Sequence, residues 1–320
     1  MTTQLTRTSK AGQALAGADA AKLAAVLDSA LAPNTRRAYR AAAERCAAWL
    51  ADRDLALTDA GLAAYVADLA DQGRAPATIK LAASAVGAVA RAQGLDDPRG
   101  ELTRQAVKGA TRANRDRGRG QVQGLDREDL EVAARLAAAD GSAAGLRDAA
   151  MLRLGSDGLL RIGELAAVQV GDLEDDAADG SARLRLAASK TDQAGEGAVL
   201  YVGAETVRAI RAWQRAASIV DGPLFRRLSR AGNVIGDQAL TPNAARAIVA
   251  RRAAAAGVDG RVSGHSLRVG SAQSLVRAGA DLPELMQAGR WRDSATAAGY
   301  AAGELAGRGA VARFFYGAGK

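Results

Sequence analysis

Six side chains of this sequence could act on one reaction centre that gains negative charge. They are Arg161, Lys190, His265, Arg268, Trp291 and Tyr300. The basic members carry positive charge or donate hydrogen bonds, which suits a phosphodiester passing through a pentacoordinate state. The tyrosine hydroxyl is a nucleophile that can form a covalent ester. Together they predict phosphoryl transfer to a tyrosine. Such a site needs no metal ion or other cofactor, because the arginines stabilise the charge.

Each of these residues also has a purely structural interpretation. His265 is the only histidine of the chain, and a lone histidine is more often a structural residue than a catalyst. Arg268 could lie on the surface of its helix, and Trp291 and Tyr300 could belong to the core. Each residue alone is a weak signal. The occurrence of all six in this order is what favours a shared site.

The composition bounds both the fold and the partner. Lysine and arginine outnumber aspartate and glutamate by 43 to 35, which gives a formal net charge of +8. This excess favours an acidic polymer as partner, most simply nucleic acid, although a basic protein with a solvated surface is the alternative. Arginine supplies most of the positive charge, and its planar fork suits phosphate. The abundance of alanine, leucine, arginine and glutamate favours helix, so a mainly α fold is expected.

Cysteine usage and hydropathy bear on the compartment. Cys46 is the only cysteine, so no internal disulfide can form, and a reducing compartment fits. One cysteine and one histidine cannot build a structural zinc site. No run of about 18 apolar residues occurs, and the N-terminus lacks the apolar core of a signal peptide. We therefore expect a soluble cytoplasmic protein with no membrane partner.

Helical spacing and its interruptions predict the domains of the chain. Residues 1–19 are small and polar and are expected to form a flexible arm. Residues 20–112 are expected to form an all-helical domain that binds DNA. Its helices are expected at 20–31, at 35–53 after an Asn34 cap, from Thr58, from about Thr78 and at 101–111. Its DNA-facing residues are expected to be Arg36, Arg40, Lys80, Arg112 and, just beyond it, Arg115.

A basic linker is expected to follow at 113–125. This segment is rich in arginine and glycine and has no apolar periodicity. It is either a solvated connection or a strap along a DNA backbone, and a linker of the second kind would let two domains close around a duplex.

Residues 126–320 are expected to form a mostly helical domain with a small antiparallel sheet. Asp126 and Thr241 are expected helix caps, and about three strands are expected between Val170 and Val202, with Lys190 at the tip of the second hairpin. Arg161 and Glu164 are neighbours on a short helix. The terminal aromatic residues either pack on their own domain or dock on a neighbouring subunit. These residues are Phe314, Phe315 and Tyr316.

The order of the six reactive residues resembles that of the tyrosine site-specific recombinases, the phage integrase family, and is most similar to the Cre-type branch. The stretch LLRIGELAAVQVGDL (159–173) is similar to the first conserved box of that family. The stretch SGHSLRVGSAQSLVRAGADLPELMQAGRW (263–291) is similar to the second. The resemblance covers both domains and is strongest from about residue 126 onward. One departure is Arg290, which stands before Trp291 where close relatives have a small residue.

The resemblance implies a role for each site residue. Tyr300 would attack the scissile phosphate and form a 3′-phosphotyrosyl bond with a free 5′-hydroxyl, while Arg161 and Arg268 hold the non-bridging oxygens. The other four would assist this step. His265 would hydrogen-bond the phosphate and help with proton transfer, Trp291 would donate its indole N–H, Lys190 would protonate the leaving oxygen, and Glu164 would orient its neighbours.

The resemblance also implies an assembly. Two domains would form a C-shaped clamp on double-stranded DNA, and four copies would meet at synapsis on paired inverted-repeat sites. The C-terminal helix would dock into a neighbouring copy, and the protein would be associated with the nucleoid through DNA. Two other functions stay open from the residues. One is a relaxing activity of the type IB topoisomerase kind, and the other is a catalytically idle DNA-binding or architectural protein.

Overall fold

The computed structural model describes residues 33–118, 120–175, 178–186, 197–307 and 309–317. Contacts within the chain divide it into two compact units, Met1–Gly120 and Gln121–Lys320. This division falls inside the segment that the sequence suggests as a linker. The expected N-terminal arm, the expected helix at 20–31 and Lys190 lie outside the described residues.

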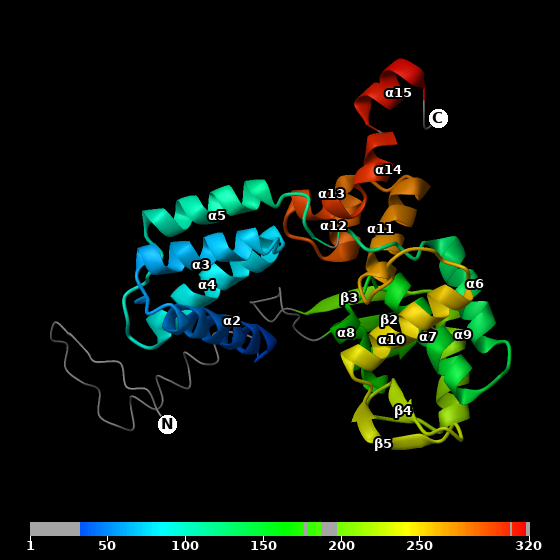
Figure 1. The fold of residues 1–320 in the computed structure, drawn as a ribbon. Coiled ribbons are helices and arrows are strands. Elements are labelled where there is room, and N and C mark those ends of the chain that lie inside the picture. Colours follow the sequence, from blue (N-terminus) through cyan, green and yellow to red (C-terminus); the bar gives the residue numbers. More distant parts are fainter. Residues whose placement is uncertain (1–32, 119, 176–177, 187–196, 308, 318–320) are drawn as a thin grey trace. The chain divides into compact units, whose positions relative to one another are not determined.

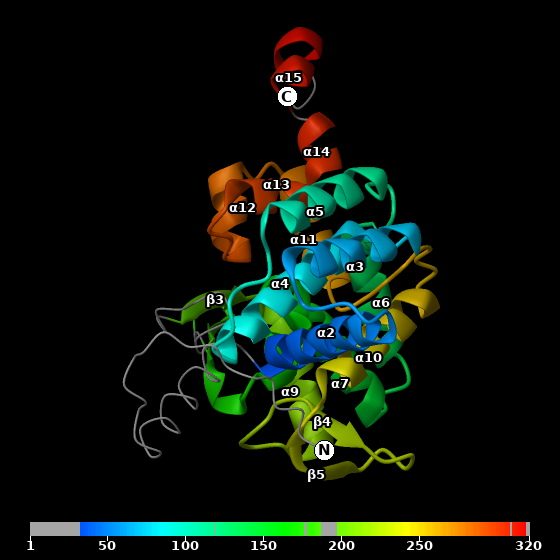
Figure 2. The same ribbon diagram turned by 60° about the vertical axis from the view of Figure 1, so that its left-hand side comes forward.

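The described residues of the first unit form four helices, drawn in blue to cyan in Figure 1. Pairs of these helices pack along their length, α2 against α4 and α3 against α5 (Figure 2). Their apolar faces share a core that includes Cys46, Leu62 and Ile79. The helices are α2 (Pro33–Asp52), α3 (Asp59–Asp71), α4 (Pro76–Ala92) and α5 (Glu101–Ala113).

Local sequence signals explain where these helices begin. The Thr58 hydroxyl accepts a hydrogen bond from the Gly61 N–H at 3.2 Å, so its predicted role as the cap of α3 is confirmed. The predicted Asn34 cap is wrong, because α2 already begins at Pro33. Proline is favoured in the first turn of a helix, since its φ is fixed and its missing N–H would have no partner there. For the same reason α4 begins at Pro76, two residues before its predicted start.

The second unit is mostly helical, as its predicted fold class requires, and has two small antiparallel sheets where one was predicted. One sheet has the strand order β1-β2-β3, and the other pairs β4 with β5. The three-stranded sheet is confirmed, while the β4–β5 hairpin was not foreseen. The elements before the second sheet are α6 (Arg127–Ala138), α7 (Ala143–Asp157), α8 (Ile162–Ala167), the 3-10 turn η1 (Val170–Asp172), β1 (Leu173–Asp175), β2 (Ala182–Leu186), β3 (Ala198–Val202) and α9 (Ala204–Ala217).

The described residues of the rest of the second unit form one hairpin and six helices. These are β4 (Arg226–Leu228), β5 (Val234–Ala239), α10 (Pro242–Ala255), α11 (Ser266–Ala278), α12 (Leu282–Gly289), α13 (Ser294–Tyr300), α14 (Ala302–Gly307) and α15 (Ala310–Tyr316). The predicted caps are confirmed. Asp126 accepts from the Asp129 N–H at 3.0 Å at the start of α6, and Thr241 accepts from the Ala244 N–H at 3.2 Å at the start of α10.

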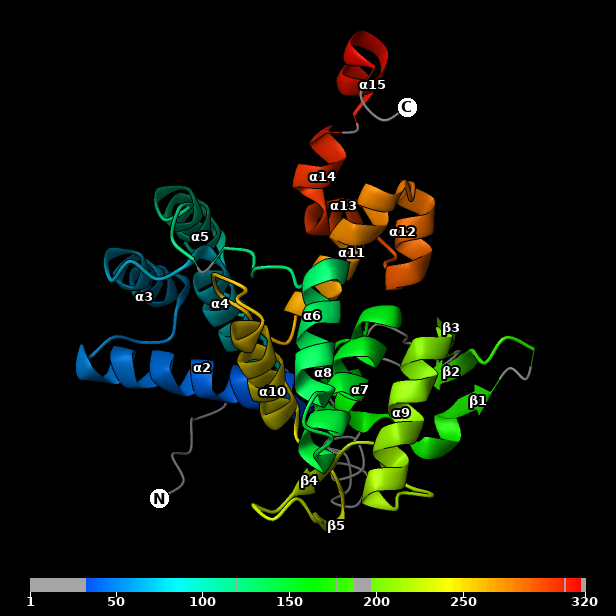
Figure 3. The same cartoon turned by 90° about the vertical axis from the view of Figure 1, so that its right-hand side faces the viewer.

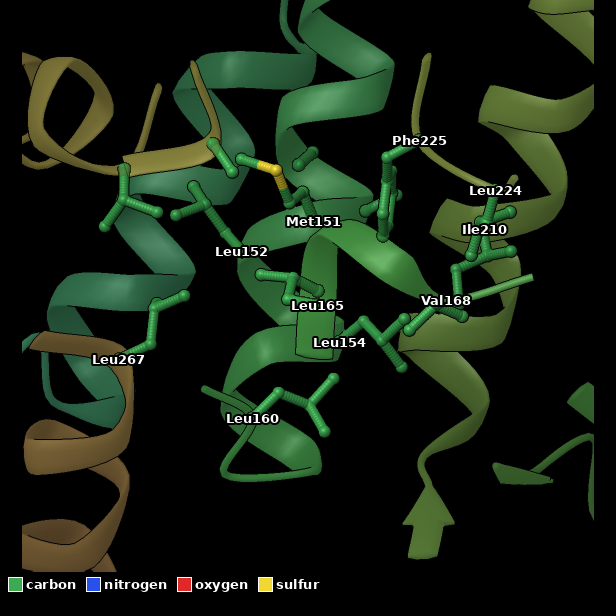
Figure 4. Close-up of a cluster of buried hydrophobic side chains, with 14 of the residues drawn as sticks. Met151, Leu152, Leu154, Leu160, Leu165, Val168, Ile210, Leu224, Phe225 and Leu267 are labelled. Atoms are coloured by element: carbon green, nitrogen blue, oxygen red, sulfur yellow. The ribbon is translucent and has the colours of Figure 1, made fainter. Parts of the chain in front are cut away.

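Helix α7 lies at the centre of the second unit, between α6 and α9 (Figure 3). Its residues Met151, Leu152 and Leu154 are fully buried and belong to one apolar cluster with Ile210 of α9 and Phe225 (Figure 4). Burial of each large apolar side chain contributes about 1.5–3 kcal/mol. The end of α7, which leads into the short helix α8, is therefore anchored by the core. No helix in the described ranges has both the length and the apolar character needed to cross a bilayer.

Candidate active site

The predicted catalytic residues that the structure describes lie at the ends of helices in the second unit. Arg161 immediately precedes α8, and His265 immediately precedes α11. Arg268 lies in the first turn of α11, and Tyr300 is the last residue of α13. Trp291 lies just beyond the end of α12. Helix ends leave backbone groups without partners inside the helix, so they are places where side chains and ligands meet the backbone.

Arg161 and Glu164 are held together by the start of α8. The Arg161 N–H donates to Glu164 Oε2 at 3.0 Å, and the Arg161 Nη1 donates to Glu164 Oε1 at 2.7 Å. Burial alone would raise the pKa of Glu164, but these two hydrogen bonds and the charge of Arg290 lower it overall. Glu164 is therefore a carboxylate at neutral pH that fixes the position of Arg161, as its predicted orienting role requires.

Arg268 is a buried arginine. Only 1% of the residue is exposed, which contradicts the alternative that it lies on the helix surface. Its Nη1 donates to the Leu159 carbonyl at 2.5 Å, and its Nη2 donates to the Gly289 carbonyl. Burial, together with the positive charges of Arg161 and Arg290, lowers the pKa of Arg268 to about 10. The guanidinium is thus still charged at neutral pH, in a place where an added anion would relieve repulsion between like charges.

Two aromatic rings cover the Arg268 guanidinium. Its carbon lies 4.4 Å from the centroid of the Trp291 ring and 5.8 Å from that of the Tyr300 ring. The two rings are 4.8 Å apart and tilted by 40°. Trp291 is 8% exposed, and an added Cβ on Gly289 would meet its ring at 2.0 Å. Glycine at 289 therefore allows the indole to fold back over α12, and Trp291 is both a core residue and a neighbour of the predicted nucleophile.

His265 completes the described set. Its backbone N–H donates to the Ser263 hydroxyl at 3.2 Å, which shapes the turn before α11. Partial burial of the ring, and then the charges of Arg268 and Arg161, lower the pKa of His265 below its ordinary value. The imidazole is therefore neutral at neutral pH, and a neutral ring can accept a proton.

Arg290 belongs to the same cluster. Its Nη2 donates to Glu164 Oε2 at 2.8 Å, and its Nη1 donates to the Gly158 carbonyl at 2.8 Å. The sequence showed only an added charge next to Trp291. Glycine is usual at the end of a helix, so an arginine there was the sequence signal that could have shown that Arg290 belongs to the cluster.

The structure does not test the roles of the remaining predicted residues. Lys190 is outside the described residues, so its general-acid role stays a prediction. The basic residues predicted to face DNA all lie in the first unit, where Arg36 is partly buried and the other four are exposed; their DNA contacts stay predictions. These four are Arg40, Lys80, Arg112 and Arg115. No group of three or more histidine, cysteine or acidic residues that could hold a metal ion occurs in the described ranges.

Comparison with known sequences gives consistent matches. A model of the phage integrase family matches residues 127–305. The chain is 35% identical over 150 residues to an integrase/recombinase xerD homolog of Selenomonas ruminantium, a match that covers 45% of this chain and 43% of that protein. It is 28% identical over 186 residues to the recombinase cre of Escherichia phage P1, with 53% of each chain covered. The matches therefore span about half the length of these curated relatives.

Solved structures show the same fold at low sequence identity. A post-cleavage complex of the XerH site-specific recombinase with a palindromic difH substrate gives a TM-score of 0.59 at 17% identity, covering 81% of this chain and 72% of that one. A lambda integrase dimer bound to a COC′ core site gives 0.57 at 16% identity, covering 88% and 93%. At these identities the likeness concerns the fold alone.

Proposed function

Because the chain belongs to the phage integrase family, we propose that it is a site-specific DNA recombinase that cuts and rejoins strands through a 3′-phosphotyrosyl intermediate. The observation that carries this proposal is the arrangement around Arg268. Its guanidinium carbon lies 5.8 Å from the centroid of the Tyr300 ring, and the positive charge of Arg161 is near enough to lower its pKa. Two neighbouring cations, one of them near the tyrosine ring, suit a phosphodiester under attack by that tyrosine.

The first step follows from the side chains. The Tyr300 oxygen attacks phosphorus and forms a P–O bond, while the bond from phosphorus to the 5′ oxygen breaks. Arg161 and Arg268 stabilise the negative charge on the non-bridging oxygens, and neutral His265 accepts the phenolic proton. We assign Lys190 as the general acid that donates a proton to the leaving 5′ oxygen. Attack by a 5′-hydroxyl from another duplex reverses these steps and joins new strands, so the exchange needs no ATP and no metal ion.

Strand exchange between two duplexes needs several copies of the chain. We assign double-stranded DNA with paired inverted repeats as the substrate and a tetramer as the synaptic assembly. The side chains of Phe314, Phe315 and Tyr316 on α15 support this assignment, since they are 78%, 78% and 81% exposed. Exposed aromatic clusters mark interaction sites. An enzyme acting on genomic DNA would work in the cytoplasm at the nucleoid.

The test is covalent capture from a library of nicked duplexes with random sequence. The nick lets the short fragment that carries the 5′-hydroxyl leave, so rejoining fails and the protein–DNA adduct accumulates. We expect adducts that survive denaturation and that share a sequence, and we expect none from Tyr300→Phe, which should still shift the same DNA in a gel.

Two outcomes would contradict the proposal. Binding without any adduct from the wild-type chain would support the idle DNA-binding alternative. Relaxation of supercoiled plasmids that lack the captured sequence would support the topoisomerase-like alternative.

A further inference from the structure

Arg290 has a backbone conformation that arginine rarely adopts. It ends α12 in the left-handed region, with φ +55° and ψ +41°. That position at a helix end is usually taken by glycine or asparagine, because other side chains are strained there. An arginine at this place calls for an explanation in what its side chain contacts.

The Arg290 side chain is turned into the protein, with 13% of it exposed. It reaches the turn between α7 and α8, more than 120 residues earlier in the chain. Its Nη1 donates to the Gly158 carbonyl at 2.8 Å, and its Nη2 donates to Glu164 at 2.8 Å and to the Leu159 carbonyl at 3.3 Å. The Arg290 guanidinium therefore joins the end of α12 to the α7–α8 turn and to Glu164 of α8.

These contacts lead to both of the arginines that the proposed function needs. Glu164 Oε1 accepts from the Arg161 side chain, and Glu164 Oε2 accepts from the Arg161 backbone N–H and from the Arg290 side chain. The Leu159 carbonyl accepts from both Arg290 and Arg268. The three arginines and Glu164 together have a net charge of +2. Without Arg290 the net charge would be +1, so Glu164 would offset half of the positive charge that Arg161 and Arg268 present to the phosphate.

Resting on the proposed function, we infer that Arg290 is a positioning residue of this site. It fixes Glu164 and the Gly158–Leu159 turn, so that Arg161 and Arg268 face one scissile phosphate in a set geometry. It also compensates the charge of Glu164. A guanidinium can do this because its planar fork donates to a carboxylate and to backbone carbonyls at the same time, which a lysine ammonium on the same strained backbone would do only in part.

The first test needs no DNA. The urea midpoint of unfolding is measured for the wild type, Arg290→Gly, Glu164→Gln and the double variant. We expect Arg290→Gly to lower the midpoint less when residue 164 is glutamine, because the ionic partner is already gone. Ser218→Gly is the matched control, since Ser218 ends α9 at φ +52° with an exposed side chain. It measures the gain from a left-handed glycine alone.

The second test uses the duplex recovered by covalent capture. At saturating DNA, we expect Arg290→Gly to slow single-turnover adduct formation by about tenfold to a hundredfold, the range expected for a misplaced catalytic group. Apparent DNA affinity should stay within about threefold, because Arg290 positions other groups and is assigned no contact with DNA. Arg290→Lys should recover part of the rate, and Ser218→Gly should react like the wild type.

The pH dependence of the cleavage rate distinguishes a positioning role of Arg290 from a purely structural one. Glu164 contacts Arg161 before α8 and Arg290 after α12, and its charge also acts on Arg268 of α11. Removing Arg290 removes one of the causes that keep the pKa of Glu164 low, so the acid limb of the cleavage rate should move to higher pH in Arg290→Gly and less so in Arg290→Lys. The titration of His265 adds an acid limb that all variants share.

The outcomes separate the two proposals. An unchanged rate and an unchanged acid limb in Arg290→Gly, with the wild type active, would overturn the positioning role alone. Equal shifts of the urea midpoint by Arg290→Gly in both backgrounds would overturn its coupling to Glu164. A wild-type chain that forms no adduct with any duplex would overturn the proposed function and this inference with it.

Discussion

Arg161 and Arg268 are assigned the same chemical task, but alanine in their places should reduce stability by very different amounts. The Arg268 guanidinium is buried under two rings and donates to two backbone carbonyls. Arg268→Ala leaves both carbonyls without these donors and opens a cavity beneath Trp291. Each hydrogen bond to a charged group contributes about 1.5–3 kcal/mol, so losing the two together costs about 3–6 kcal/mol. We expect a loss in that range.

Arg161→Ala should cost much less. The Arg161 side chain is 27% exposed, and its partner Glu164 keeps the hydrogen bond from Arg290 when Arg161 is removed. A partly exposed ion pair contributes up to about 1 kcal/mol. The loss of stability should therefore stay near or below that value, while cleavage should be lost in both variants.

Urea unfolding followed by tryptophan fluorescence can measure this contrast within the second unit. The chain has three tryptophans, and Trp49→Phe removes the one in the first unit, so Trp213 and Trp291 report on the second. Arg277→Ala is the matched control, because Arg277 lies on the same helix as Arg268 with 48% of its side chain exposed. If Arg268→Ala lowers the free energy of unfolding no more than Arg277→Ala does, the buried contacts do not stabilise the site, and the reasoning fails.

Three further predictions concern other residues of the second unit. Gly270→Ala should destabilise the chain by about 1–3 kcal/mol, because an added Cβ would meet the Leu125 carbonyl oxygen at 1.9 Å; Gly303→Ala, whose Cβ would meet nothing within 4 Å, should leave the melting temperature nearly unchanged. His265 should titrate below the ordinary histidine pKa in NMR spectra of the untagged chain, where it gives the only histidine signal. Its folded pKa lies below its unfolded value, so stability should fall as pH drops below about 6.5, and a midpoint at or above that value would contradict the local electrostatics. Asp148→Asn should lower the free energy of unfolding by about 3–5 kcal/mol in urea titrations, since the fully buried carboxylate accepts from three arginine side chains; a change under about 1 kcal/mol would show that these arginines find other partners.

The sequence was sufficient for the helical class and for part of the local detail. Threonine or aspartate before an apolar period predicted caps that the structure confirms at Thr58, Asp126 and Thr241. The sequence failed for the β4–β5 hairpin because β5 is partly or fully exposed throughout its length. A strand with little burial carries no alternation of apolar and polar residues, so periodicity cannot reveal it.

The site was predictable in residue type but not in how its parts support one another. The sequence offered surface and phosphate site as alternatives for Arg268, and core and phosphate site for Trp291. Both residues also stabilise the fold, because the buried Arg268 guanidinium donates to backbone carbonyls and the Trp291 indole covers it. Spacing along a chain does not show which carbonyls a distant turn will present, because those depend on how the turns meet in three dimensions.

Two strained backbone positions indicate how the site is kept in order. Leu159 and Arg290 both have positive φ, +44° and +55°, and neither is glycine. Each such residue costs on the order of 1–3 kcal/mol, which a fold tolerates only when surrounding contacts hold it in place. The Leu159 side chain is 4% exposed in the cluster around Trp291, and its carbonyl accepts from Arg268 and Arg290. A glycine at either position would relieve the backbone strain, but the contacts of the Leu159 or Arg290 side chain would be lost. The strain at these two residues is therefore tolerated because their side chains help to hold the site together.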